Sequence, residues 1–151
     1  MRTALVVFTS IVSAACSSPV SESTPVPEAD AAAGSIPGCY TVVLGGKPAD
    51  DVSLPTLIEL SSEPATMFLD PGRFAVKEPG APVPKAPFSW WTPASGGGLE
   101  VALGGGYTGY TFSLRPSGQG SWSGEGAYCA DFGVLPEPGP LPVRLTPRSC
   151  P

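Results

Sequence analysis

The clearest structural signal in this 151-residue chain lies in residues 99–115, which read LEVALGGGYTGYTFSLR. Apolar residues occupy every second position of 99–103 and again of 110–115, and glycines 104–106 separate the two runs. A two-residue period is that of a β-strand with one buried face. A short glycine run between two such strands is typical of a hairpin turn. The segment therefore predicts a pair of antiparallel strands.

Proline and glycine interrupt the rest of the chain, which contains 20 Pro and 19 Gly. Beyond residue 35 the longest segment free of both is 56–63, whereas the mean globular helix has about 11 to 12 residues. Strands of about five or six residues fit between these interruptions. Strands are predicted at 39–44, 56–61, 66–69, 73–77, 88–92, 99–103, 107–115, 120–132 and 143–146. We expect an all-β domain, a small antiparallel up-and-down β-barrel of about eight strands, with a β-sandwich as the alternative.

Composition excludes several classes of function. Hydrophobic residues make up 42% and aromatic residues 9% of the chain, which is too apolar for a disordered protein. Histidine is absent, so Ser-His-Asp and Cys-His catalysis and imidazole metal ligation are excluded. Eight basic against 13 acidic residues give a net charge of −5, and no basic run occurs. We therefore expect no nucleic-acid partner.

Acidic residues offer two further possibilities, a metal site and carboxylate catalysis. Asp50 and Asp51 are adjacent in a predicted loop, but no calcium-loop spacing surrounds them, so no metal site is predicted. Glu59, Glu100, Glu125 and Asp131 alternate with apolar neighbours, which places them on outer faces rather than across a cleft. We expect a protein without enzymatic activity and without a cofactor.

The N-terminus has the order of an export signal. Met1 and Arg2 precede the apolar segment 4–12, and small residues lead to Cys16. This order resembles the leader of bacterial lipoproteins, although Ser13 stands where their lipobox usually has Leu. The resemblance implies a signal peptide at 1–15, a lipidated Cys16, and stable anchoring of an exported protein in the bacterial envelope through several acyl chains. Cleavage near residues 14–15, giving a soluble secreted or periplasmic protein, is the alternative.

Beyond Cys16, the Ser-, Pro- and Ala-rich segment 16–37 carries acidic but no basic residues and predicts a disordered tether. The folded domain is then 38–151. It holds three cysteines in an oxidising compartment, enough for one disulfide. In a closed antiparallel barrel the first and last strands are neighbours, which favours Cys39 with Cys150. Pairings of Cys39 with Cys129 and of Cys129 with Cys150 remain open.

Aromatic side chains are the best candidates for a binding site. Trp90 and Trp91 are consecutive in a predicted strand, so their rings point to opposite faces. Phe88 shares the parity of Trp90, and both are predicted to face the barrel interior with four other aromatic residues. The candidate ligand-lining set is Trp90, Tyr110, Phe112, Trp122 and Tyr128. These rings fit either a packed core or the mouth of a barrel that holds one small apolar or sugar-like ligand.

The leader, the tether and the small all-β domain together resemble uncharacterised envelope lipoproteins with a lipocalin-like or, more broadly, calycin-like barrel. The residues that carry the resemblance are Gly38-Cys39-Tyr40, Gly120-Ser121-Trp122 and the terminal segment 144–150. In lipocalins the Gly-x-Trp motif lies on the first strand, whereas here it lies near the last. The leading hypothesis is a non-enzymatic envelope lipoprotein that binds a small hydrophobic ligand. The alternative is a structural or protein-interaction module with a filled barrel, one face of which docks another envelope protein.

Overall fold

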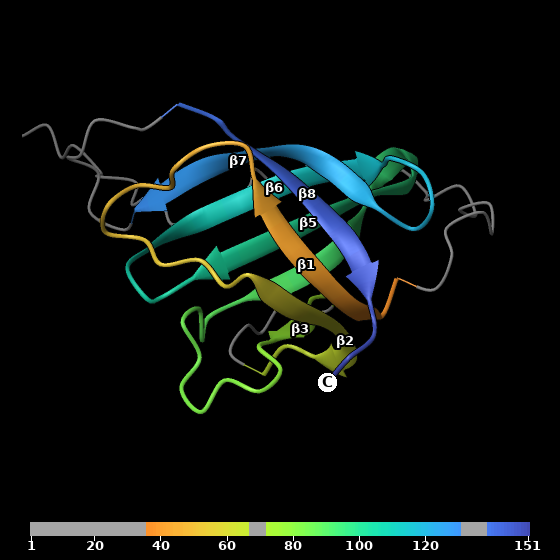
Figure 1. Ribbon diagram of the computed structural model, residues 1–151, viewed down its shortest axis with the longest axis horizontal. Coiled ribbons are helices and arrows are strands. Elements are labelled where there is room, and N and C mark those ends of the chain that lie inside the picture. Colours follow the sequence, from red (N-terminus) through yellow and green to blue (C-terminus); the bar gives the residue numbers. More distant parts are fainter. Residues whose placement is uncertain (1–35, 67–71, 131–138) are drawn as a thin grey trace, which may run out of the picture.

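The computed structural model describes residues 36–66, 72–130 and 139–151. These residues form a closed antiparallel barrel in which each strand pairs with the next and β8 pairs with β1 (Figure 1). The strands are β1 (Gly38–Leu44), β2 (Leu57–Pro64), β3 (Phe74–Lys77), β4 (Trp90–Ala94), β5 (Gly98–Gly104), β6 (Thr108–Pro116), β7 (Trp122–Ala130) and β8 (Leu141–Arg148). The predicted all-β class and the eight-stranded up-and-down barrel are confirmed.

Eight of the nine predicted strands are present, each end within three residues of its prediction. Thr66 lies in a turn, and the rest of the predicted strand 66–69 falls outside the described residues. β4 begins at Trp90, two residues later than predicted, and runs to Ala94. The single turn of 3₁₀-helix η1 (Ser95–Gly97) then leads into β5. Within η1, Gly96 and Gly97 have φ of 68° and 69°, a left-handed conformation that glycine adopts without a Cβ penalty.

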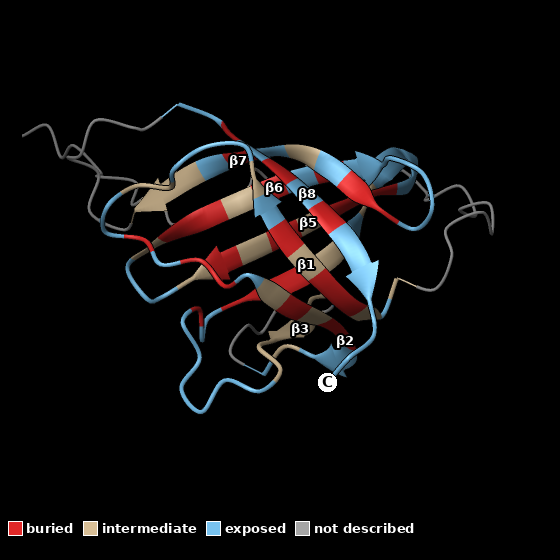
Figure 2. Cartoon of the chain, in the orientation of Figure 1, coloured by how far each residue is buried: buried red, intermediate tan, exposed pale blue. Residues whose placement is uncertain are grey.

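Buried and exposed residues alternate along the strands, so the barrel has one apolar inner face (Figure 2). Every strand except the short β3 contributes fully buried residues to a single core, and β3 adds partly buried ones. From the strands the buried members are Tyr40, Val42, Ile58, Leu60, Trp91, Leu99, Val101, Leu103, Tyr110, Phe112, Leu114, Trp122, Leu141, Val143 and Leu145. This is the inward alternation that closes a small barrel around side chains.

Two predicted interior positions are wrong. Phe88 precedes β4, in the β3–β4 connection, and is 37% exposed. Trp91, not Trp90, belongs to the core. Trp90 pairs with Ala102, the outward neighbour of core residues in β5, and directly opposed residues share a face of the sheet. The partner strand therefore sets the phase of β4, and Trp90 is buried on the outer face instead.

The two ends of the barrel differ in what they carry (Figure 1). We call the end where β1 begins and β8 ends the terminal rim, because both ends of the described chain leave from it. The opposite end, the loop rim, carries the β1–β2 connection (45–56), the β3–β4 connection (78–89) and the β5–β6 turn (105–107). Successive strands run in opposite directions, so the connections alternate between the two rims.

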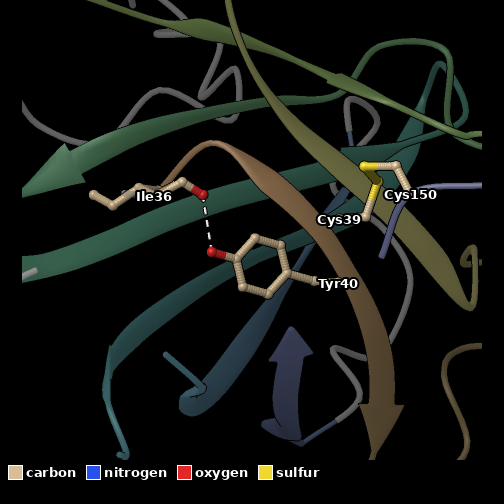
Figure 3. Close-up of a disulfide and its surroundings, with 4 residues drawn as sticks. All are labelled: Ile36, Cys39, Tyr40 and Cys150. Atoms are coloured by element: carbon tan, nitrogen blue, oxygen red, sulfur yellow. Dashed lines mark hydrogen bonds between the residues drawn. A yellow bond between two sulfur atoms is a disulfide. The ribbon is translucent and has the colours of Figure 1, made fainter. Parts of the chain in front are cut away.

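A disulfide closes the terminal rim. Cys39 near the start of β1 is bonded to Cys150 just after β8, with a Cα–Cα distance of 5.2 Å (Figure 3). The bond lies outside the barrel, whereas the next residue, Tyr40, points inward and donates a hydrogen bond of 2.8 Å to the carbonyl of Ile36. The preferred pairing is confirmed. Cys129 is a free, half-buried thiol, 3.5 Å from the hydroxyl of Thr111. Within the described ranges, no helix is long and apolar enough to cross a membrane.

Candidate functional site

Three of the five candidate ligand-lining residues lie fully inside the barrel. Tyr110, Phe112 and Trp122 are between 1% and 4% exposed. The rings of Tyr110 and Phe112 stack with centroids 5.8 Å apart, and Tyr128 meets Tyr110 edge to face at 5.7 Å. These are the separations at which aromatic pairs attract. The interior aromatic residues thus contact one another.

Glycine in β7 makes room for these rings. A Cβ on Gly126 would stand 2.5 Å from Cδ1 of Phe112, closer than carbon atoms approach without repulsion. The ring therefore occupies the space that a side chain at position 126 would fill. This agrees with the glycine–aromatic alternation of 120–132 in the sequence, and it shows that the packing of this wall is tight.

The two adjacent tryptophans have different environments. Trp91 stacks on Phe74 with centroids 4.7 Å apart, and its Nε1 donates a 2.8 Å hydrogen bond to the carbonyl of Ser61. On the other face of the sheet, the guanidinium of Arg73 lies 4.1 Å from the ring centroid of Trp90, within the range of a cation–π contact. Four of the predicted site residues thus share the inner face, and Trp90 is separated from them by the sheet.

The loop rim is capped by a segment that was not predicted to contribute to the core. Val52 and Leu54, in the β1–β2 connection, are buried in the core cluster. The backbone N–H of Ala49 donates a 3.0 Å hydrogen bond to the hydroxyl of Tyr110. The apolar residues at alternate positions 52 and 54 are the signal of this burial in the sequence, but they lie in a predicted loop and not in a predicted strand.

A second tyrosine also holds this cap in place. The hydroxyl of Tyr128 donates a 2.8 Å hydrogen bond to the carboxylate of Asp51. This hydrogen bond to a negative acceptor, together with smaller contributions from burial and charge, raises the pKa of Tyr128 to about 12. The cap is therefore held by one tyrosine from each of two neighbouring strands, β6 and β7.

Both acidic residues of this loop already have an interaction partner within the chain. Lys47 forms an ion pair with Asp50, which lowers the pKa of the Asp50 carboxyl, while Asp51 accepts from Tyr128. In the part of the chain that the structure describes, no three His, Cys, Asp or Glu residues are grouped to hold a metal ion. Glu100 of β5 and Glu125 of β7 are both directly opposite Ser113 of β6 in the sheet, so they lie on the outer face, as predicted. Asp131 lies outside the described residues.

The outer wall is hollowed over β6 and β7. A depression of about 410 Å³ is lined by Thr111, Ser113, Glu125, Gly126, Ala127, Tyr128 and Pro140. Gly126 is the last residue of β7 that pairs with β8, and the depression lies where β7 continues beyond it. Its volume is that of a small-molecule site, but it lies on the outer side of the barrel, and most of its lining side chains point away from the core aromatic residues.

Apolar side chains are exposed at the loop rim. Tyr107 in the β5–β6 turn is 71% exposed, Val83 in the β3–β4 connection 77%, and Phe88 at the end of that connection 37%. Phe88 lies beside the β5–β6 turn, because its N–H donates to the carbonyl of Gly104 at 3.1 Å. Two connections therefore present apolar surface together, at the end opposite the disulfide.

Comparison of the chain with protein-family models, with curated proteins and with solved structures found no match. The closed eight-stranded up-and-down barrel is consistent with the lipocalin-like architecture that the sequence resembles.

Proposed function

We propose that the protein is an exported, lipid-anchored component of a bacterial envelope, and that its filled β-barrel serves as a non-enzymatic module that binds another envelope protein. The observation that carries this proposal is the occupied interior. Tyr110, Phe112 and Trp122, with which a barrel would hold a ligand, are almost inaccessible, and the rings of Tyr110 and Phe112 stack on each other. A barrel of this size either is filled by side chains or holds one ligand, and the packing favours the filled form.

The surface features supply the second part of the argument. β1 begins at the terminal rim, so an anchor at Cys16 would attach the barrel through that rim, and the loop rim is the end opposite the attachment. The loop rim is also the end at which Val83, Phe88 and Tyr107 are exposed. Exposed aromatic residues are enriched where proteins bind one another. The Cys39–Cys150 disulfide is also in keeping with an oxidising compartment.

Site-specific photocrosslinking in the native envelope tests this role. A photoreactive residue at Tyr107 should give a discrete adduct with one protein. The matched control is Ser117, which is exposed in the β6–β7 turn at the terminal rim and should give none. Absence of an adduct at Tyr107, or equal adducts at both positions, would contradict the proposal.

The second candidate function is binding of a small hydrophobic ligand. It is favoured by the cap, since the 45–56 segment is held to Tyr110 and Tyr128 by side-chain hydrogen bonds, and its displacement would uncover the interior. Tryptophan fluorescence separates the two functions. Saturable quenching by lipids or hydrophobic dyes that is altered by Trp122→Ala would favour the ligand, and no response would favour the filled module.

A further inference from the structure

An unpaired cationic surface lies on the outer wall at the terminal rim. Arg115 at the end of β6 pairs with Ser123 at the start of β7, and Ser123 pairs with Arg144 of β8. Strands are about 4.8 Å apart, so the two arginines flank Ser123 roughly 10 Å from each other. Arg148, four residues beyond Arg144 on β8, shares its outward face. We call Arg115, Arg144 and Arg148 the arginine patch.

The charges of the patch are not neutralised by the described part of the chain. All three arginines are exposed, and none forms an ion pair with any residue of 36–66, 72–130 or 139–151. The nearest acidic groups on this face are Glu125, diagonal to Arg115 and Arg144 on β7, Glu100, diagonal to Arg115 on β5, and Glu59, two strands from Arg148.

The patch contrasts with the composition of the chain. After residue 15 the protein has seven basic and 13 acidic residues. Lys47 and Lys77 are paired with carboxylates, and Arg73 lies over a tryptophan. The four remaining basic residues are Lys85 and the three arginines of the patch, which lie together on the outer wall at the terminal rim. At physiological salt, charges more than about 8 Å apart are largely screened, so an approaching anionic surface would meet this local cluster rather than the net negative charge.

We propose that the arginine patch docks the barrel on the anionic lipid headgroups of the membrane that holds the protein. The proposal rests on the lipid anchor of the proposed function and adds an orientation to it. The tether predicted from the sequence at 16–37 would have a root-mean-square span of roughly 25 Å, so the anchored barrel would reach the bilayer. Guanidinium groups form paired hydrogen bonds with phosphate oxygens. Docking of this rim would leave the exposed apolar loops facing away from the membrane.

Vesicle co-sedimentation tests the docking separately from the anchor. The mature chain from residue 16, carrying Cys16→Ser so that no acyl chain contributes, is mixed with phosphatidylcholine vesicles with or without phosphatidylglycerol. Each arginine near an anionic surface contributes about 1 kcal/mol, so the triple variant Arg115→Gln/Arg144→Gln/Arg148→Gln should bind the anionic vesicles about 100-fold more weakly than the unaltered chain.

The control variant Lys47→Gln/Lys77→Gln/Lys85→Gln removes the same number of positive charges outside the arginine patch and should bind as the unaltered chain does. Equal binding to both vesicle types, no loss in the arginine variant, or the same loss in both variants would overturn the proposal. So would release of the chain by inorganic phosphate at constant ionic strength, which would identify a free anion as the ligand. Failure of the anchor itself would appear only in the mass of the native N-terminus.

Discussion

Removal of the Cys39–Cys150 bond is expected to cost much of the free energy of unfolding. The bond joins residues separated by 111 positions. In the chain-entropy model, closing a loop of that length lowers the entropy of the unfolded chain and stabilises the fold by about 5 kcal/mol at room temperature. Domains of this size are stable by about 5 to 15 kcal/mol in total. The barrel without its disulfide should therefore be close to the limit of stability.

The measurement is urea unfolding followed by tryptophan fluorescence. The reference protein carries Cys129→Ser, so that no third thiol can exchange, and the test protein carries Cys39→Ala and Cys150→Ala in addition. With a urea dependence of about 2 kcal/mol per molar, the midpoint should fall by about 2 to 3 M. Reduction of the reference protein should give the same midpoint as the double substitution, which separates the effect of the bond from the loss of two sulfur atoms.

Two results would refute the reasoning. If the midpoint falls by less than about 0.5 M, equivalent to about 1 kcal/mol, closure of the long loop does not contribute as the entropy model requires. If the test protein loses its barrel even without urea while the reduced reference keeps it, packing of the sulfur atoms, rather than the covalent closure, accounts for the effect.

The other predictions concern packing, titration and processing. Gly126→Ala should lower stability by about 1 to 3 kcal/mol because the new methyl group overlaps a core ring, whereas Gly139→Ala, which meets open space, should change it by less than about 0.5 kcal/mol; equal effects in urea unfolding would contradict the packing. In an ultraviolet pH titration, the pKa of Tyr128 should be near 12 and return toward about 10 in Asp51→Asn. The contribution of this hydrogen bond to stability should be complete below pH 10 and lost as the pH rises through 12, and an unchanged titration would refute the contact. Mass spectrometry of the native protein should find acyl chains on Cys16, and an unmodified or differently cleaved N-terminus would refute the anchor.

The strands were predictable because their signals are local. Alternation at 99–103 and 110–115, and the interruptions by proline and glycine, fix the length and the spacing of the elements. The disulfide was also predictable, since closure of an antiparallel barrel makes the first and last strands neighbours whatever their exact register. Both inferences depend on topology and periodicity, which a single sequence expresses directly.

Two features were not predictable in the same way: which face of a strand points inward, and which residues distant in the sequence pack together. Trp90 and Trp91 are equally apolar, and only pairing of Trp91 with Val101 determines which ring enters the core. Val52 and Leu54 are buried in a core built by strands distant in the sequence, and their alternation within a loop does not show that the loop folds over the barrel. The arginine patch likewise joins residues of β6 and β8 that become neighbours only across β7.

The position of the Cys39–Cys150 disulfide also determines how the barrel responds to mechanical force. Tension arriving through the chain before Gly38 enters β1, a strand bonded on one side to β2 and on the other to β8. At the second residue of β1, the Cys39–Cys150 bond transmits part of this force to the segment that follows β8. Force applied at the N-terminal end of β1 is therefore shared by the first and last strands. The barrel should resist unfolding that begins at β1.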